Sequence, residues 1–283
     1  MDDLEQRLLP REARSTRYKA SSIIELETTI DPRKFIRRLG KPVSLSRMLE
    51  TEVFYYKEVD GEEARNAVLV QGLPGVGLVA KAAVAYLLDK TKNVKICRFI
   101  SPDFQSIASI RDGLIVNSFA DLFLTRTRRP LLLLYGNAQP STSFGQHEFS
   151  DKLMEVCANL GCSFVLTLGG YGRQITAEER KVYCSSTRDE VLKKYLPKIN
   201  GSVFSGQIIG VAGILLTEAA RRNIDNLSVL AETFGAVPDF EGARKAVEAV
   251  VKLADLDLEV GTPEEISNSY SDVLSRNELS SGV

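Results

Sequence analysis

The chain has 283 residues, of which 44% are hydrophobic and 26% charged, as in ordinary globular proteins. Its 36 Lys and Arg balance 37 Asp and Glu, and the resulting net charge of −1 argues against a dedicated nucleic-acid-binding protein. The length permits one large α/β domain or two smaller ones. No apolar run approaches the roughly 20 residues that cross a bilayer, and the polar N-terminus is unlike a secretory signal, so we expect a cytoplasmic protein.

Residues 1–50 differ in composition from the rest of the chain and are predicted to form a partly ordered N-terminal extension. They are rich in Arg, Ser and Glu, and Pro10, Pro32 and Pro42 interrupt any long helix. A short helix is predicted over 31–39, with an aspartate as its N-cap and a proline at its first position. Its basic residues could contact an acidic partner, but a solvated helix face is the interpretation that we favour.

From residue 51 onward, predicted strands and helices alternate along the chain. Strands are predicted over 51–56, 67–70, 94–100, 113–117, 131–135, 163–168 and 227–231. The continuous apolar runs at 131–134 and 164–168 are typical of strands that are covered on both faces. The alternation predicts one three-layer α/β domain over 51–261, with a mostly parallel central sheet and helices on both faces, followed by a C-terminal helix and tail over 262–283.

The helices between these strands have recognisable ends. Capping-box spacing occurs at three predicted helix starts, Ser143–Gln146, Thr187–Glu190 and Thr262–Glu265, and the third also has a proline in its first turn. Gly161 stands where a left-handed C-cap is expected. Further helices are predicted over 78–88, 211–222 and 239–253.

A glycine-rich loop over 72–77 joins a predicted strand to a predicted helix, which is where α/β proteins bind anions. Its candidate residues are Gly72, Pro74, Gly75 and Gly77. The spacing is GxxGxG rather than GxGxxG, no acidic residue ends the following strand, and no GK[ST] follows, so no standard nucleotide motif is present. We favour a tight turn whose glycines permit close packing, and a phosphate or nucleotide role stays open as the alternative.

Two further loop clusters follow predicted strands. Their candidate residues are Gly169, Gly170, Tyr171 and Arg173 after the strand at 163–168, and Gln139 and Pro140 after the strand at 131–135. Because ligands and partners bind at the carboxyl ends of strands in open α/β sheets, we expect the three loops to converge on one edge. Such convergence could form a small-molecule pocket or a surface for another protein.

The chain contains few residues of the kinds that catalysis uses. His147 is its only histidine and falls in the first turn of a predicted helix, and no nucleophile elbow or carboxylate pair is evident. The four cysteines, Cys97, Cys157, Cys162 and Cys184, have no metal-site spacing and are expected to be buried as small apolar residues. We therefore expect no catalytic residue, no metal and no cofactor.

Several motifs occur in a recognisable order. They are Gly-x-Pro-Gly-x-Gly-Leu-Val over 72–79, Gln-Pro-Ser-Thr over 139–142, Gly-Cys at 161–162, Leu-Gly-Gly-Tyr-Gly over 168–172, Ile-Gly-Val-Ala-Gly-Ile-Leu-Leu-Thr-Glu-Ala over 209–219 and Leu-Ala-Glu-Thr over 230–233. The ordered set resembles the proteasome assembly chaperone 2 family, specifically its archaeal-type members. The resemblance covers roughly residues 53–258 and is much more specific than any one glycine loop.

The resemblance implies a single α/β domain of the phosphorylase/hydrolase-like kind that self-associates and acts without catalysis. It implies binding to proteasome α-subunits or to a paralogue during ring assembly. Nucleic acid and membrane are not expected as partners, because the charges balance and no apolar run is long enough to cross a bilayer. Some archaeal members end in a hydrophobic-Tyr-X tail that inserts between α-subunits. This chain ends in Leu279–Val283 without that pattern, so docking through such a tail is not expected.

The leading hypothesis is a non-catalytic, cytoplasmic homo-oligomer that acts as a proteasome assembly chaperone-like protein, either as a closed ring or as a dimer-based assembly. Apolar surfaces completed by partners would be its physical basis. Phe104 and the segment Leu122–Leu124 are candidates for such a surface, although core positions are at least equally plausible for them.

The alternative hypothesis is a phosphate- or nucleotide-binding enzyme or ligand sensor that uses the convergent loops as its pocket. Backbone N–H groups near Gly75 and Gly77 would hold the phosphate, and Arg173 would act as a charge clamp. The predicted fold resembles one that hosts phosphorylases, but a fold alone does not determine function.

Overall fold

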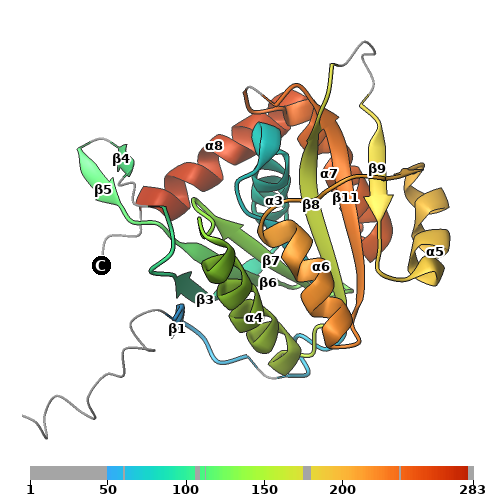
Figure 1. Ribbon diagram of the computed structural model, residues 1–283. Coiled ribbons are helices and arrows are strands. Elements are labelled where there is room, and N and C mark those ends of the chain that lie inside the picture. Colours follow the sequence, from blue (N-terminus) through green and yellow to red (C-terminus); the bar gives the residue numbers. More distant parts are fainter. Residues whose placement is uncertain are drawn as a thin grey trace, which may run out of the picture. The chain divides into compact units, whose positions relative to one another are not determined.

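The computed structural model describes residues 50–279, apart from 60, 106–108, 112, 175–179 and 236 (Figure 1). The predicted N-terminal extension, with its short helix at 31–39, therefore lies outside the described residues except for its last position. The strands are β1 (Glu52–Tyr55), β2 (Val68–Gly72), β3 (Asn93–Ile100), β4 (Ser109–Arg111), β5 (Leu114–Val116), β6 (Ala120–Thr125), β7 (Leu131–Gly136), β8 (Phe164–Gly172), β9 (Val182–Ser185), β10 (Ser202–Val203) and β11 (Asp225–Thr233). The helices are η4 (Val76–Leu78), α3 (Val79–Lys90), α4 (Ser143–Asn159), α5 (Asp189–Ile199), α6 (Val211–Arg221), α7 (Phe240–Ala254) and α8 (Pro263–Leu279).

The described strands form one large mixed sheet in the order β1-β3-β6-β7-β2-β8-β11-β9-β10, with β4 and β5 as a separate hairpin. Its centre is parallel, as predicted, because β7, β2, β8 and β11 pair in that direction. Outside this centre the pairing becomes antiparallel, at β1, β3 and β6 on one side and at β9 on the other. The sheet is therefore mixed. Only residues 126–130 separate β6 from β7, and so short a connection permits a hairpin but no parallel crossover.

Helices cover both faces of the sheet and complete the predicted three-layer α/β domain. In Figure 1, α4 and α6 lie side by side in front of the sheet, and α3 and α7 lie behind it. The back layer also holds α5 and α8, which bury their apolar faces in the same core as α3 and α7. Residues 79–88 of α3 are all buried, because α7 and α8 cover this alanine-rich helix on the side away from the sheet. Apolar burial thus fixes α3, which follows the loop at the carboxyl end of β2, against the sheet.

The segment Leu122–Leu124 is buried, and it forms the middle of β6. This strand was not predicted, and it lies inside the sheet between β3 and β7. Phe104 is also buried, and its ring lies 5.9 Å from that of Phe149. The core interpretation of these residues is therefore correct, and the prediction that they form an exposed docking surface is wrong.

The predicted cap of α4 is displaced by one residue. Thr142, not Ser143, is the N-cap, and its hydroxyl accepts a hydrogen bond from the Gly145 N–H at 3.1 Å. The carboxylate of Asp103 holds this threonine in place by accepting bonds from its N–H at 2.8 Å and its hydroxyl at 2.9 Å. At the other end of the helix, Gly161 has φ +81°, which confirms the predicted left-handed C-cap.

The other two predicted capping boxes have opposite outcomes. Thr187 does not cap α5, which begins after Arg188 without a side-chain cap, and the threonine hydroxyl instead accepts a hydrogen bond from Asn226 Nδ2 at 2.6 Å. The box at α8 is confirmed. The Thr262 N–H donates to Glu265 Oε2 at 2.7 Å, and the Glu265 N–H donates to Thr262 Oγ1 at 3.3 Å.

The four cysteines are free and buried, as expected of small apolar residues. Cys157 lies on α4 and Cys162 precedes β8. Burial raises the pKa of both thiols, and it raises the pKa of Cys97 and Cys184 to about 12. A thiol with so high a pKa is almost entirely protonated at neutral pH, and therefore a poor nucleophile and metal ligand.

Candidate binding cavity at the carboxyl edge

The carboxyl ends of the central strands surround a partly open cavity of about 450 Å³, here called the edge cavity. Its lining residues are Gln71, Leu73, Pro74, Gly75, Val76, Ala80, Gln139, Leu168, Gly169, Gly170, Tyr171, Gly172, Phe204, Gln207, Ile208, Ile209, Ala212 and Leu230. They come from the end of β2 and the loop after it, the loop after β7, the end of β8, β11, the segment that enters α6, and the first turns of α3 and α6. The structure thus brings residues of all three predicted loop clusters together at one site.

The candidate residues divide into two groups according to their position. Those that line the edge cavity are Pro74, Gly75, Gln139, Gly169, Gly170 and Tyr171. Those that lie outside its lining are Gly72, Gly77, Pro140 and Arg173. Of the second group, Gly77 packs against Thr233, and Arg173 contacts Glu232 and Tyr183 beside the cavity.

Two glycines let the loop after β2 approach the sheet closely. Gly77 has φ +61°, and a Cβ added there would lie 2.4 Å from Thr233 Oγ1. A Cβ added at Gly170 would lie 2.3 Å from the carbonyl oxygen of Val76. By contrast, a Cβ at Gly75 would meet nothing within 4 Å. These contacts favour the prediction of a tight turn whose glycines permit close packing.

Glutamine side chains hold the backbone around the edge cavity. Gln139 Nε2 donates to the Pro74 carbonyl at 2.8 Å, and Gln139 Oε1 lies 3.5 Å from the Val211 N–H at the start of α6. Gln71 is buried, and its amide donates to the Leu168 carbonyl at 3.0 Å and accepts from the Leu73 N–H at 2.9 Å. These amides therefore join the loop after β2 to α6 and to β8.

Aromatic rings form one wall of the edge cavity. The ring of Tyr171 meets the edges of Tyr183 and Phe204, with centroids 5.4 and 5.3 Å away. Beside it, the Glu232 carboxylate accepts a hydrogen bond from the Tyr183 hydroxyl at 3.0 Å and lies 3.4 Å from the Arg173 guanidinium. Burial and the hydrogen bond to Glu232 raise the pKa of Tyr183. Arg173 is thus engaged beside the cavity.

The lining of the edge cavity carries no charged side chain among the described residues. A phosphate group placed there would meet no cation, because Arg173 lies outside the lining and contacts Glu232 and Tyr183 instead. The polar groups that the cavity offers are amides, a phenol and backbone atoms. Its chemistry therefore favours an uncharged ligand with an apolar body over an anion.

Sequence reasoning missed the segment that closes the edge cavity before α6. Phe204, Gln207, Ile208, Ile209 and Ala212 line the cavity. The sequence signal was an apolar pair, Ile208 and Ile209, between Gly206 and Gly210. Part of this segment also belongs to the motif over 209–219, but it had not been associated with the three loops.

Four exposed apolar side chains lie beside the loops at this edge, here called the apolar rim. Their exposed fractions are 50% for Val76, 87% for Ile209, 60% for Phe234 and 67% for Val237. Val76 and Ile209 line the edge cavity, and Val76 Cγ1 lies close to Gly235, next to Phe234. Clustered exposed apolar residues of this kind mark sites of interaction.

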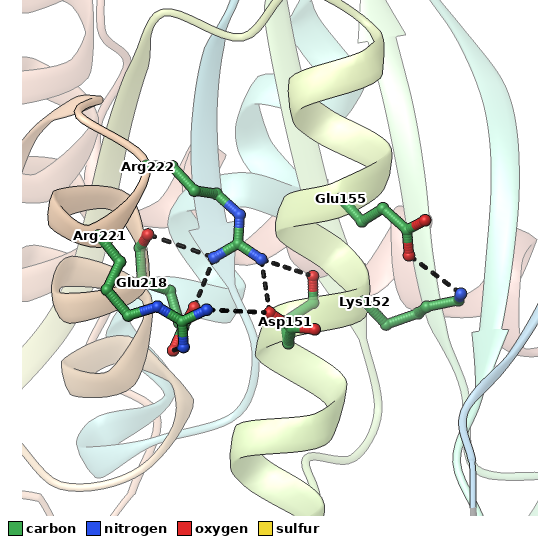
Figure 2. A network of polar contacts seen from close by, with 6 residues as sticks. All are labelled: Asp151, Lys152, Glu155, Glu218, Arg221 and Arg222. Carbon is green, nitrogen blue, oxygen red and sulfur yellow. Dashed lines mark hydrogen bonds and ion pairs between the residues drawn. The ribbon is translucent and has the colours of Figure 1, made fainter.

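A network of charged residues fixes α6, which walls the edge cavity, to α4. Figure 2 shows Arg222, just after α6, between Glu218 and Asp151, with its guanidinium 2.5 Å from each carboxylate. Arg221 also contacts Glu218, at 3.0 Å. Lys152 and Glu155 form a separate pair on the exposed side of α4. The network joins the C-terminal end of α6 to the middle of α4, far along the helix from the cavity.

His147 lies in the first turn of α4, as predicted, and borders a shallow pocket between α4, α6 and the segment after β9. Within residues 50–279 as described, no three or more His, Cys, Asp or Glu side chains are grouped so as to hold a metal ion. None of the described helices has the length and apolar character needed to cross a membrane.

Comparison with known proteins identifies relatives over most of the chain. The PAC2 family model matches residues 69–269. The uncharacterized protein MJ1210 of Methanocaldococcus jannaschii is 30% identical over 215 residues, which cover 75% of this chain and 83% of that protein.

Two crystal structures from Pyrococcus furiosus share the fold. PbaB, described as an archaeal proteasome activator, is 24% identical with a TM-score of 0.71, covering 81% of this chain and 99% of PbaB. PbaA, described as an archaeal homolog of proteasome-assembly chaperone, is 23% identical with a TM-score of 0.63, covering 80% of this chain and 91% of PbaA.

Proposed function

Since this chain belongs to the PAC2 family, we propose that it is a non-catalytic, proteasome assembly chaperone-like protein that binds proteasome α-subunits and associates with itself. The fold that it shares with PbaA and PbaB supports this role, because one is described as a homolog of proteasome-assembly chaperone and the other as a proteasome activator. A paralogue could take the place of the second copy. The proposed location is the cytoplasm.

The observation that carries the proposal is the apolar rim around an uncharged cavity. Burying one such side chain against a partner contributes about 1.5–3 kcal/mol, so burying several of them can drive association without any reactive group. The glycines, prolines and glutamines of the loops shape this edge and do not supply nucleophiles or acids. Shape and apolar surface are what a chaperone for subunit assembly needs.

A second surface supports self-association. Strand β1 lies at one end of the sheet and pairs with β3 on one side. Phe54 and Tyr55 on this strand, and Tyr56 just after it, are exposed. An edge strand with exposed aromatic residues offers both backbone pairing and apolar burial to a second copy. Light scattering of the full chain at micromolar concentration should therefore show a dimer or a larger closed assembly, and a strict monomer would refute self-association.

The binding of α-subunits can be tested with purified components. The full chain and proteasome α-subunits should co-elute from a sizing column, and both Val76→Asp and Ile209→Asp should weaken the complex about tenfold or more, which corresponds to 1.4 kcal/mol or more. Ile115→Asp is the matched control, since the exposed fraction of Ile115 lies between those of Val76 and Ile209 but the residue is on the β4–β5 hairpin. Failure of the wild-type chain to bind α-subunits would refute the proposal.

The non-catalytic role has its own measurement. Calorimetry of the full chain with inorganic phosphate and with ATP should detect no binding, because the edge cavity offers no cationic side chain in its described lining. Saturable binding of either compound that is lost on Gln139→Leu would instead support the enzyme or ligand-sensor hypothesis.

A further inference from the structure

Strand β8 extends beyond its neighbour β2 at the edge cavity. The two strands pair in parallel only from Phe164 to Thr167, whereas β8 continues to Gly172. On its other side β8 stays paired with β11 along its whole length, up to Thr233 opposite Gly172. The last residues of β8 are thus an internal strand on one side and an edge strand on the other.

Gln71 marks the point at which the two strands separate. In a regular parallel ladder the Leu73 N–H would donate directly to the Leu168 carbonyl. Instead the Gln71 amide lies between them, donating to the Leu168 carbonyl at 3.0 Å and accepting from the Leu73 N–H at 2.9 Å. The glutamine therefore replaces the last ladder bond and holds the strands apart.

The backbone groups beyond this point face the edge cavity. Along a strand, successive residues direct their N–H and C=O groups to alternate sides, and the Arg173 N–H donates to the Thr233 carbonyl on β11. Leu168 has its carbonyl on the opposite side, toward Gln71. By the same alternation, Gly170 and Gly172 direct their backbone groups away from β11, and both residues line the cavity.

We infer that the edge cavity is a strand-addition site: an extended, uncharged segment of a protein partner pairs with the free edge of β8 at Gly170 and Gly172 and inserts an apolar side chain between Tyr171 and Ile209. Backbone pairing provides affinity in this mode of recognition, and the side-chain pocket provides selectivity. The uncharged lining of amides, aromatic rings and aliphatic groups excludes an acidic or basic side chain. The inference deepens the proposed function and rests on it for the partner's identity, which would be the proteasome α-subunit.

The first test uses blocked peptides as the probe and the wild-type full chain as the receptor. Acetyl-Thr-Ser-Leu-Ser-Thr-amide should shift the amide resonances of Gly170 and Gly172 in a titration followed by nuclear magnetic resonance. Two variant peptides serve as controls, one with Asp in place of Leu and one with an N-methylated Leu. Each should bind at least about tenfold more weakly, which corresponds to a loss of at least about 1.4 kcal/mol of binding free energy. Equal binding of the N-methylated peptide would overturn strand addition, since methylation removes a donor and blocks the edge.

The second test fills the cavity. Ala212 lies on α6 and lines the cavity, whereas Ala220 lies on the same helix and is exposed. Ala212→Phe should abolish the shifts caused by the Leu peptide, and Ala220→Phe should leave them unchanged. Undiminished binding of the Leu peptide to a folded Ala212→Phe chain would overturn the inference. If Ala212→Phe does not fold, the comparison of the Leu peptide with its N-methylated form on the wild-type chain decides the question.

Failure of this inference is distinguishable from failure of the proposed function. If α-subunits bind the wild-type chain and Ala212→Phe equally well, the proposed function stands and the strand-addition site falls. If the Leu peptide binds at Gly170 and Gly172 but α-subunits do not bind the chain, the site stands and the proposed partner falls.

Discussion

The two ends of α6 are held in different ways. At its C-terminal end, Arg222 bridges Glu218 and Asp151 at 2.5 Å from each (Figure 2). The Glu218 side chain is only 6% exposed and that of Arg222 22%, so this pair is largely shielded from solvent, whereas the Asp151 side chain is 56% exposed. These ion pairs join α6 to α4, which lies beside it in the same layer.

At its N-terminal end, α6 has only the Gln139 amide nearby as a side-chain polar neighbour among the hydrogen bonds of the described residues. Around it lie the edge cavity and the exposed side chain of Ile209. Gly210, which precedes the helix, has φ +86° and provides no side-chain cap.

This difference indicates that one end of α6 positions the helix and that the other end is available to bind a partner. Ion pairs within the chain fix the C-terminal end of α6, where we propose no partner. At the N-terminal end, the described lining of the edge cavity has no charged side chain. A partner that binds at the N-terminal end therefore displaces mainly water from apolar surface. Its binding does not require any of these ion pairs to break. Substitutions at each end can test whether the two ends are independent in this sense.

The largest effect is expected at the cavity floor. Gly170→Val places a branched side chain where even a Cβ would lie 2.3 Å from the Val76 carbonyl oxygen, a backbone atom that cannot move alone. The free energy of unfolding should fall by about 3 kcal/mol or more, because the added side chain would overlap the backbone and force it to shift. Urea unfolding measures this loss. Gly75→Ala, where a Cβ meets nothing within 4 Å, should change the stability by less than about 1 kcal/mol.

The second effect concerns the charged end. Arg222→Ala leaves the buried Glu218 carboxylate with Arg221 as its remaining ion-pair partner and frees Asp151 from its closest one. The expected loss is about 2 kcal/mol, between the values for exposed and for fully buried pairs. The matched control is Lys152→Ala in the exposed pair of Figure 2, which should change stability by no more than about 0.5 kcal/mol.

Binding should separate the two ends more sharply than stability does. Arg222→Ala should keep the affinity for the Leu peptide and for α-subunits within about twofold of the wild type, since its contacts are remote from the cavity. A loss of binding comparable to that of Ala212→Phe would show that the two ends of α6 are coupled.

A smaller effect is expected from Gln139, the polar group nearest the N-terminal end. Gln139→Ala removes the hydrogen bond to the Pro74 carbonyl at 2.8 Å. One lost bond of this kind costs about 1 kcal/mol, to be measured as a shift of the urea midpoint. A cost larger than that of Arg222→Ala would reverse the proposed order and show that the loop, not the charged network, fixes α6.

The sequence predicted the convergence at the carboxyl edge because strand ends and glycine loops leave local signals. The loops at 72–77, 136–142 and 169–173 each follow a strand with a strong apolar pattern, and parallel strands bring such loops together. The free edge of β8 had no such signal. It depends on where β2 and β8 separate, which the Gln71 side chain determines through contacts that sequence periodicity does not encode.

Two other differences have the same origin. The segment that enters α6 was missed because β10 has only two residues, Ser202 and Val203, and so carries no periodic pattern. Strand β6 was missed because its continuous apolar run, Leu122–Leu124, has only three residues, too few to distinguish a strand inside the sheet from a surface patch. Short elements whose burial depends on distant neighbours are beyond local sequence reasoning.

The smallest effect is expected at Asp89, whose ion pair with Arg276 is more solvent-exposed than the Arg222–Glu218 pair. Asp89, on α3, accepts hydrogen bonds from Ser269 at 2.9 Å and from the exposed Arg276 at 2.6 Å, both on α8. Partial burial would raise the pKa of Asp89, but the hydrogen bonds from Lys90, Ser269 and Arg276 outweigh it and hold that pKa below its ordinary value of 3.8.

Because the pKa of Asp89 is lower in the folded chain, its contribution to stability is present above pH 3.8 and disappears as the pH falls through the folded-state pKa. Asp89→Asn should therefore lower the free energy of unfolding by less than about 1 kcal/mol at pH 7 and by progressively less below pH 4. Asp257→Asn, at an exposed position after α7, is the control and should have little effect at either pH. If the cost of Asp89→Asn instead exceeded that of Arg222→Ala at pH 7, solvent shielding would not be what makes the charged end of α6 strong.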